Sequence, residues 1–187
     1  MRDAPSGLLP VEISVGALFD DALTHCGRRA GCSPEAVLDR LRGGDPEMHG
    51  TFRYALAKGL GAYLGSLGVP FRAVYVYGSA MGNASSPCSD IDIILDLDHP
   101  TDRVDRLMRG LDIALVTQFR ALFPWARHLA TLLDVKTVSA NEENGRNRYS
   151  GGFSGLGTSP VCLWRFPPET GVLQPEDPRR SPRVTAR

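Results

Sequence analysis

Two aspartates separated by one residue, Asp90 and Asp92, follow a glycine–serine pair, Gly78 and Ser79, after ten intervening residues. Residues two apart on a β-strand point to the same face, so this spacing places both carboxylates together. Two carboxylates on one face repel each other unless a cation lies between them. Mg²⁺ prefers hard oxygen ligands and commonly shares them with substrate phosphates. The pattern therefore predicts a Mg²⁺ site beside a phosphate-binding turn.

The glycine–serine pair suits the binding of phosphate groups. Gly78 follows the apolar segment FRAVYVY, and a glycine at a strand end lets the backbone turn sharply and approach a ligand closely. Ser79 offers a hydroxyl and a backbone N–H, both of which can donate to phosphate oxygens. We therefore expect Gly78 and Ser79 to contact the phosphates of a nucleotide.

A third carboxylate, Asp134, lies in the apolar stretch LLDV. An acid in such a setting is costly unless it is paired or bound to a metal. Three carboxylates can hold two metal ions and orient an in-line attack on a phosphoryl group. Asp134 could also accept the proton of an incoming hydroxyl as a general base. The alternatives are a solvated strand face for Asp90 and Asp92, and a partly exposed edge position for Asp134.

The stretch GSAMGNASSPCSDIDIIL, residues 78–95, resembles the signature of the DNA polymerase β-like nucleotidyltransferase superfamily, especially its minimal and antibiotic-modifying members. That signature comprises a GS pair, a loop that often contains proline and ends in serine, a DxD motif and a distant third aspartate. The resemblance extends from Phe71 to Val138 and includes the preceding helix. The matching residues are Gly78, Ser79, Pro87, Ser89, Asp90, Asp92 and Asp134.

The resemblance implies a fold and an activity. The fold would be a mixed β-sheet flanked by helices, with the metal ions at one edge. The activity would be transfer of a nucleoside monophosphate from an NTP to a hydroxyl-bearing acceptor, with two Mg²⁺ ions and release of pyrophosphate. In this family the acceptor is a small molecule, a tRNA end or a protein side chain. By resemblance, Asp90, Asp92 and Asp134 would be catalytic and bind metal, and Gly78, Ser79 and Ser89 would bind the nucleotide.

The loop from Ala80 to Ser89 contains no basic residue, so cations for the triphosphate must come from elsewhere. Lys136 shares a strand face with Asp134, which makes it a candidate nucleotide contact and equally a candidate ion-pair partner of that carboxylate. The glycine-rich segment 151–157 is either a lid over the nucleotide or a simple loop. The candidate cations are Lys58, Arg72, Lys136, Arg146 and Arg148.

Hydrophobic periodicity predicts the elements that position these residues. Two N-terminal helices are expected, the first ending at Gly27 and the second spanning residues 36–42 after the start signal Ser33-Pro34-Glu35. A longer helix begins at Asp45-Pro46-Glu47 and ends at Gly68. The remaining elements are strands at 71–77, 91–97 and 129–138, and a helix at 104–122 that ends before Pro124. This order predicts an α/β (α+β) fold with a mixed sheet.

The pattern also divides the chain into parts. Residues 1–44 form an N-terminal helical extension, and residues 45–166 form the predicted nucleotidyltransferase domain. Residues 167–187 make a tail rich in proline and arginine that is expected to pack poorly.

Composition narrows the functional class. The chain has 187 residues, enough for one domain whose core needs no disulfide or metal. Its 21 basic and 21 acidic residues cancel, which argues against a nucleic-acid coat or a polybasic membrane binder. The sequence has no apolar run long enough for a membrane helix and no signal-peptide profile at its start. Four cysteines without a CxxC pair indicate reduced thiols and a cytoplasmic location.

Two alternatives belong to other functional classes. The first is a non-catalytic nucleotidyltransferase-like binding module with a protein partner, as in a toxin–antitoxin pair. The second is a helix-turn-helix regulator, because the segment AGCS at 30–33, followed by Val37 and Leu41, resembles the core of that motif. Acidic neighbours, and Gly27 where a small alanine is usual, weigh against DNA binding. Its candidate phosphate contacts are Arg28, Arg29, Arg40 and Arg42.

Overall fold

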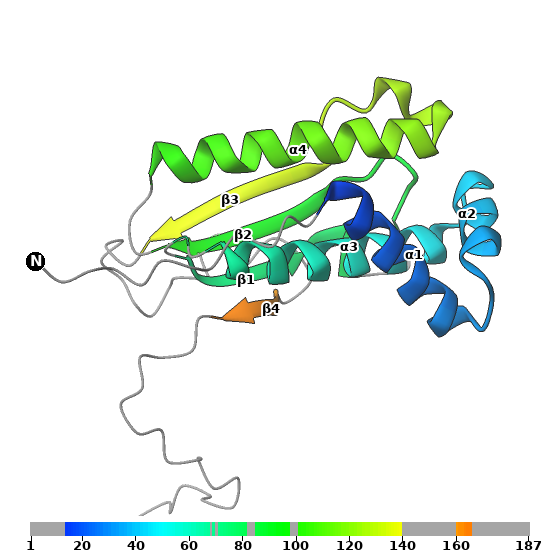
Figure 1. The fold of residues 1–187 in the computed structure, drawn as a ribbon, viewed down its shortest axis with the longest axis horizontal. Helices are drawn as coiled ribbons and strands as arrows, with labels where there is room; N and C mark the ends of the chain where they lie inside the picture. Colours follow the sequence, from blue (N-terminus) through cyan, green and yellow to red (C-terminus); the bar gives the residue numbers. More distant parts are fainter. Residues whose placement is uncertain are drawn as a thin grey trace, which may run out of the picture.

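The computed structural model describes residues 14–67, 69, 71–81, 85–97, 101–139 and 160–165. Within them, four α-helices and a four-stranded mixed sheet form a mixed α/β fold (Figure 1). The helices are α1 (Val15–Ala30), α2 (Pro34–Arg42), α3 (Pro46–Ser66) and α4 (Asp102–Leu122). The strands are β1 (Phe71–Tyr77), β2 (Ile91–Leu97), β3 (Leu133–Ser139) and β4 (Val161–Arg165). Two short 3₁₀ helices, η1 (Gly78–Met81) and η2 (Pro124–His128), follow β1 and α4.

The sheet has the strand order β3-β2-β1-β4. β1 pairs antiparallel with both β2 and β4, whereas β2 and β3 pair in parallel. A parallel pair needs a long crossover connection, and α4 lies in the connection between β2 and β3. In the resulting register, Asp92 of β2 has Asp134 as its neighbour on one side and Tyr77 on the other. The topology thus brings the acidic strands and the end of β1 together.

The two faces of the sheet have different environments. On one face, side chains such as Val76 and Ile93 belong to the main apolar core, which also contains buried side chains of all four helices. Figure 1 shows α3 and α4 running alongside the strands. Asp92 alternates with Ile91 and Ile93 along β2, so its side chain points to the other face. On that face a second, smaller cluster contains Ala73, Tyr75, Tyr77 and Ile94.

All four α-helices begin where the sequence supplies a capping side chain. Each cap accepts a hydrogen bond from the backbone N–H three residues later, which satisfies a donor that the helix itself cannot pair. The start signals predicted for α2 and α3 are confirmed, each with a proline in the first turn. The capping residues are Ser14, Ser33, Asp45 and Thr101.

Two predicted boundaries are wrong. α1 continues past Gly27 and ends at Ala30, where Gly31, with a φ of 66°, forms a left-handed cap. Gly27 serves packing inside the helix instead, because a Cβ there would lie 2.6 Å from the carbonyl oxygen of Cys32. β3 begins at Leu133 rather than Leu129. Residues 124–128 form η2, the N–H of Leu129 donates back to the carbonyl oxygen of Ala126, and the N–H of Leu132 donates to the Asp112 carboxylate.

β4 is an element that the periodicity does not predict, because its five residues are too few to show a clear alternation. The strand pairs with β1 and packs against α3. A Cβ on Gly65 of α3 would overlap the indole of Trp164, and one on Gly61 would lie 3.0 Å from Cβ of Leu163. The glycines that weaken α3 as an isolated helix therefore make room for β4.

The N-terminal helices share the core with the sheet. Leu18 and Phe19 of α1 and Leu41 of α2 are buried in the same apolar cluster as the residues of β2. The predicted boundary at residue 44 therefore falls within one continuous core. The predicted tail, residues 167–187, lies outside the described residues.

Two expectations from composition can be compared with the structure. In the described part of the chain, every helix is too short or too polar to cross a membrane. All four cysteines are free thiols, including Cys26 and Cys32, which are close in sequence. Burial raises the pKa of the Cys26 thiol to about 12, so this thiol is protonated and unreactive at neutral pH.

Candidate functional site

Asp90, Asp92 and Asp134 lie together at the end of the sheet where β2 and β3 begin. One carboxylate oxygen from each residue falls within 4.8 Å of the other two, and none of the three side chains is fully buried. The register explains the grouping, because Asp92 and Asp134 are direct neighbours across the β2–β3 pair and Asp90 lies one residue before β2. The structure therefore brings together the three carboxylates that the sequence singles out.

The glycine–serine pair adjoins this carboxylate cluster, because β1 ends opposite Asp92. Gly78 has a φ of 69°, and a Cβ on it would overlap the Asp92 carboxylate. The backbone N–H of Ser79 donates a hydrogen bond to the same carboxylate. Glycine at position 78 is thus required both by the turn and by the close approach of Asp92. The pair shapes the acidic cluster directly, a role that the sequence does not predict.

Serine side chains tie the loop that joins η1 to β2. The Ser85 hydroxyl donates to the carbonyl oxygen of Ser79 at 2.6 Å. The backbone N–H of Ser86 donates to the Ser89 hydroxyl at 3.0 Å. Ser89, the predicted nucleotide contact, therefore lies directly before Asp90 with its hydroxyl bonded within the loop.

The central carboxylate of the cluster is harder to ionise than an ordinary aspartate. The pKa of Asp92 is raised, chiefly by burial and then by the charges of Asp90 and Asp134. Lys136 and the Ser79 N–H act in the opposite direction. A divalent cation would replace this repulsion with attraction, since bound cations are often the largest local charges in a site. The electrostatics of the cluster therefore favour a bound cation at neutral pH.

Lys136 is the candidate cation that the structure brings to the cluster. Its Nζ lies 5.1 Å from the centroid of the Tyr77 ring, close enough for a cation–π interaction. The pKa of the Lys136 amine is raised, first by its contact with Tyr77 and then by the charges of Asp134 and Asp92. The exposed ammonium thus lies within the field of the acidic cluster and is held against an aromatic ring.

The other predicted cations lie elsewhere. Arg72 pairs with Asp96 at 2.8 Å, towards the opposite end of β2. Lys58 is exposed on α3, and its charge adds to burial in lowering the pKa of His25 on α1. Arg146, Arg148 and the glycine-rich segment 151–157 lie outside the described residues.

Arg53 of α3 is a site residue that the sequence analysis does not identify. Its side chain is fully buried, with 0% exposure. Its guanidinium donates to the carbonyl oxygens of Pro87 at 2.7 Å and Ser89 at 2.8 Å. Both acceptors belong to the loop that leads into Asp90. Arg53 therefore fixes the backbone directly before the first carboxylate of the cluster.

His49 completes this buried support one helical turn earlier. Its Nε2 lies 2.9 Å from the carbonyl oxygen of Leu41, which can only accept, so Nε2 carries the proton. Nδ1 then accepts from Arg53 at 3.1 Å. Burial, followed by the charge of Arg53, lowers the pKa of His49 to about 4, so the ring is neutral at pH 7. A histidine and an arginine four residues apart on an otherwise apolar helix face are the signal that could have revealed this pair.

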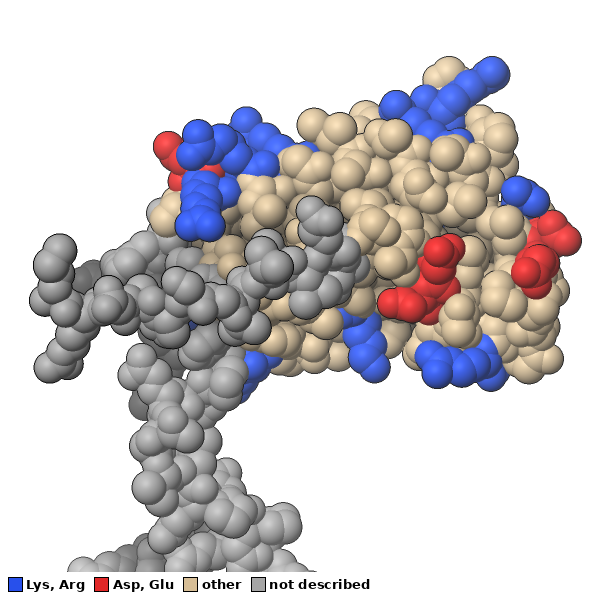
Figure 2. Space-filling model, viewed as in Figure 1, with Lys and Arg blue, Asp and Glu red and all other residues tan. Residues whose placement is uncertain are grey.

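A short turn joins α1 and α2, and two of the four candidate arginines have acidic partners. Arg40 pairs with Asp45 at 2.6 Å, and Arg42 lies 3.6 Å from Asp39. On the face shown in Figure 2, basic side chains occupy several separate groups rather than one continuous patch. These contacts add nothing in favour of DNA binding.

Comparison of the chain with protein-family models, curated proteins and solved structures finds no match. The site residues and their geometry are therefore the evidence for function. Membership of the nucleotidyltransferase superfamily, inferred from residues 78–95, stays a prediction.

We expect Gly78→Ala to damage the carboxylate cluster, and Gly31→Ala is a matched control. Both glycines have a positive φ, 69° and 66°, but no atom outside the immediate chain lies within 4 Å of a Cβ on Gly31. Gly31→Ala should lower the free energy of unfolding by about 1 kcal/mol through backbone strain alone. Gly78→Ala should lower it further and abolish Mn²⁺ binding, measured by calorimetric titration, because Asp92 must move. Equal destabilisation with Mn²⁺ binding intact would contradict this account.

We expect Arg53→Met to be strongly destabilising, with Arg40→Met as the control. Removing Arg53 leaves two loop carbonyls without their donor, which should lower the free energy of unfolding by about 3 kcal/mol. Arg40 has a side chain that is 42% exposed, so losing its ion pair should lower the free energy of unfolding far less than losing Arg53. Urea unfolding measures both values. Similar costs for the two variants would show that the buried guanidinium does not hold the loop.

Proposed function

We propose that this protein is a Mg²⁺-dependent nucleotidyltransferase that moves a nucleoside monophosphate from an NTP to a hydroxyl-bearing acceptor. The observation that carries the proposal is the grouping of Asp90, Asp92 and Asp134 beside the turn at Gly78. This grouping is what the resemblance to the DNA polymerase β-like nucleotidyltransferases leads one to expect. The four free cysteines support a cytoplasmic location.

The donor set of the cluster suits Mg²⁺. Its ligand atoms are carboxylate oxygens from three aspartates, whereas zinc sites usually draw on nitrogen or sulfur. The pKa of Asp92 is raised by burial and then by the charges of Asp90 and Asp134, and a bound cation would offset both effects. Asp90, Asp92 and Asp134 would hold two Mg²⁺ ions, which would neutralise the triphosphate and align the attacking and leaving oxygens.

The chain's own residues have separate roles in the proposed step. A carboxylate oxygen of Asp134 accepts the proton of the acceptor hydroxyl while the hydroxyl oxygen forms a bond to the α-phosphorus. The bond from the α-phosphorus to its bridging oxygen breaks, and pyrophosphate leaves with that electron pair. The turn at Gly78 and Ser79 positions the phosphates, and Lys136 contributes positive charge to them. Such transfer depends mainly on positioning and charge neutralisation.

The same site bears on the charge of the acceptor and on the alternative function. Lys136 is the cation that the described residues bring to the cluster, so a polyanionic acceptor such as a tRNA is disfavoured. The alternative is a non-catalytic module that acts through a protein partner. It would keep the fold but would not need to respond to Mg²⁺ and nucleotide together.

Asp92→Asn tests the proposal through thermal unfolding. The amide keeps an oxygen that accepts the Ser79 N–H but removes the central charge. We expect the metal-free variant to melt a few degrees above the wild type, because repulsion in the cluster is relieved. Mg²⁺ with an NTP should raise the melting temperature of the wild type and not that of the variant, since a ligand of the native state must stabilise it.

The control for this experiment is Asp105→Asn, which removes an exposed carboxylate on α4 and should keep the full response. A wild-type protein that shows no shift with any NTP and Mg²⁺ would overturn the proposal and favour the binding module.

The raised pKa of Asp92 also sets a pH dependence for the metal-free protein. Between the ordinary value of 3.8 and the raised value, the native state holds a proton that the unfolded chain has lost. As the pH rises through that window, ionisation of Asp92 therefore lowers the free energy of unfolding. At lower pH, where Asp92 is protonated in both states, this destabilisation is absent. Asp92→Asn should remove this decline from the pH profile of stability.

A further inference from the structure

The outer edge of β3 has no strand partner among the described residues. β3 stands at one end of the strand order, so one side of it pairs with β2 and the other side faces outward. The N–H of Ile91 donates to the carbonyl oxygen of Leu132, and in a parallel ladder this bond means that the even-numbered residues of β3 pair with β2. The backbone groups of Leu133, Val135 and Thr137 therefore point away from β2.

Asp112 of α4 closes the beginning of this edge. Its carboxylate accepts from the N–H groups of Leu132 at 2.8 Å and Leu133 at 2.9 Å. Further along, the side chain of Thr137 is exposed and that of Val135 is half-buried. The open part of the edge therefore begins at the carbonyl group of Leu133 and includes the N–H and C=O groups of Val135 and Thr137.

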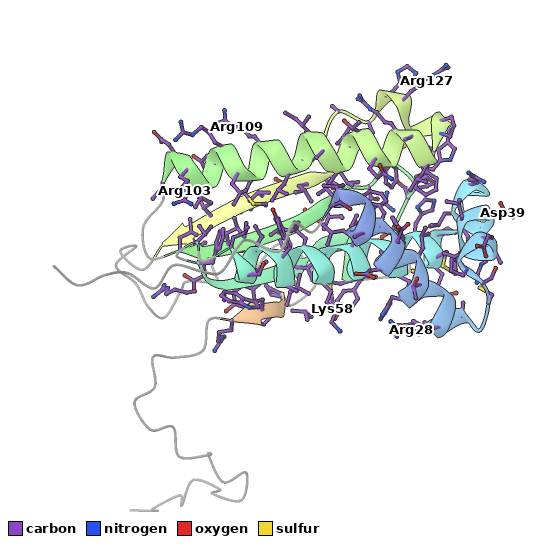
Figure 3. The ribbon with its side chains drawn as sticks, in the orientation of Figure 1. Arg28, Asp39, Lys58, Arg103, Arg109 and Arg127 are labelled. Atoms are coloured by element: carbon purple, nitrogen blue, oxygen red, sulfur yellow. The ribbon has the colours of Figure 1, made fainter. Side chains whose placement is uncertain are left out.

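A groove of about 380 Å³ runs between this edge and α4. Its β3 wall consists of alternate side chains from Leu133 to Thr137, and its α4 wall includes Met108 and Arg109. Figure 1 shows α4 next to β3, and Figure 3 shows Arg109 on the outer side of α4, away from α3. Ile113, one helical turn after Arg109, is 67% exposed, more than any other large apolar side chain in the described part of the chain. The edge and the flank of α4 thus offer both backbone groups and apolar side chains.

The charges of β3 make the strand complementary to itself. Asp134 and Lys136 lie on the same face of the strand, on either side of Val135. If two copies of β3 pair antiparallel about Val135, Asp134 of each copy lies opposite Lys136 of the other. Moving the centre of pairing by one residue would instead place two aspartates or two lysines opposite each other, which is unfavourable. The charges therefore select the register that is centred on Val135.

The same register matches the outward backbone groups. The Val135 residues of the two copies exchange N–H and C=O hydrogen bonds, and each Thr137 N–H donates to the Leu133 carbonyl oxygen of the other copy. This ladder does not need the Leu133 N–H, which Asp112 already holds. The strands are related by a two-fold axis normal to the sheet, so the same surface serves both copies and both α4 helices lie on one face of the joined sheet.

We infer that the outer edge of β3 and the adjoining flank of α4 form a homodimer interface, in which two sheets join through antiparallel β3 strands. A lysine on an edge strand usually discourages such pairing. Here Lys136 meets Asp134 of the second copy in a non-hydrogen-bonded pair, where side chains approach most closely. The inference is independent of the proposed function, because it concerns how two copies pair and not what the carboxylate cluster binds.

Sedimentation velocity of the full chain without divalent cations tests the charge pairing. We expect the wild type to dimerise between about 1 and about 100 µM. Lys136→Asp and Asp134→Lys should each raise the Kd of the dimer at least about tenfold, because like charges then face each other across the strands. The double variant restores opposite charges, so its Kd should return to within about threefold of the wild-type value.

Thr137→Pro tests the backbone ladder, and Thr137→Ala is its matched control. Edge strands tolerate proline where the missing N–H faces outward, so Thr137→Pro should keep its circular dichroism spectrum and become monomeric. Thr137→Ala keeps the N–H and should stay dimeric. If Thr137→Pro does not fold, the charge variants decide.

Three results would each overturn the inference. One is a wild type that is monomeric at about 100 µM. The second is a dimer whose Kd is unchanged in Lys136→Asp or in a folded Thr137→Pro variant. The third is a double charge variant that dimerises as weakly as the single variants.

Discussion

Repulsion among three carboxylates at one end of the sheet is the constraint on which the rest of the site depends. The parallel pairing of β2 and β3 makes Asp92 and Asp134 neighbours, and the residue before β2 adds Asp90. One carboxylate oxygen of each residue lies within 4.8 Å of the other two, and the pKa of Asp92 is raised, chiefly by burial and then by the charges of Asp90 and Asp134. Such an arrangement is typical of a site that becomes favourable when a cation binds.

The surrounding structure is built to resist that repulsion. On one side, the turn at Gly78 gives the Asp92 carboxylate room and the Ser79 N–H holds it. On the other side, the buried Arg53 anchors the loop before Asp90, and neutral His49 orients the guanidinium. The cluster is thus held by backbone donors and a buried cation rather than by direct ion pairs. This arrangement leaves carboxylate oxygens of the cluster available to bind a metal ion.

The sequence predicts those parts of the molecule that depend on local spacing. The alternation along β2 places Asp92 on the face away from the core, and the apolar setting of Asp134 marks the third acid. The hydrogen bonds from Arg53 to the loop join residues more than thirty positions apart, so local spacing could reveal the His49–Arg53 pair on α3 but not the carbonyl oxygens that Arg53 contacts. β4 is missed for a similar reason, because its place depends on the space that Gly65 leaves on α3.

The central claim is that the carboxylate cluster binds divalent cations together with a nucleotide. The most direct measurement is anomalous diffraction from crystals of the full chain soaked with Mn²⁺ and a non-hydrolysable NTP analogue. The account predicts Mn²⁺ bonded to carboxylate oxygens of Asp90, Asp92 and Asp134 and to the phosphates, with the triphosphate beside Gly78. Mn²⁺ bound elsewhere, or a nucleotide seated away from these three residues, would contradict it.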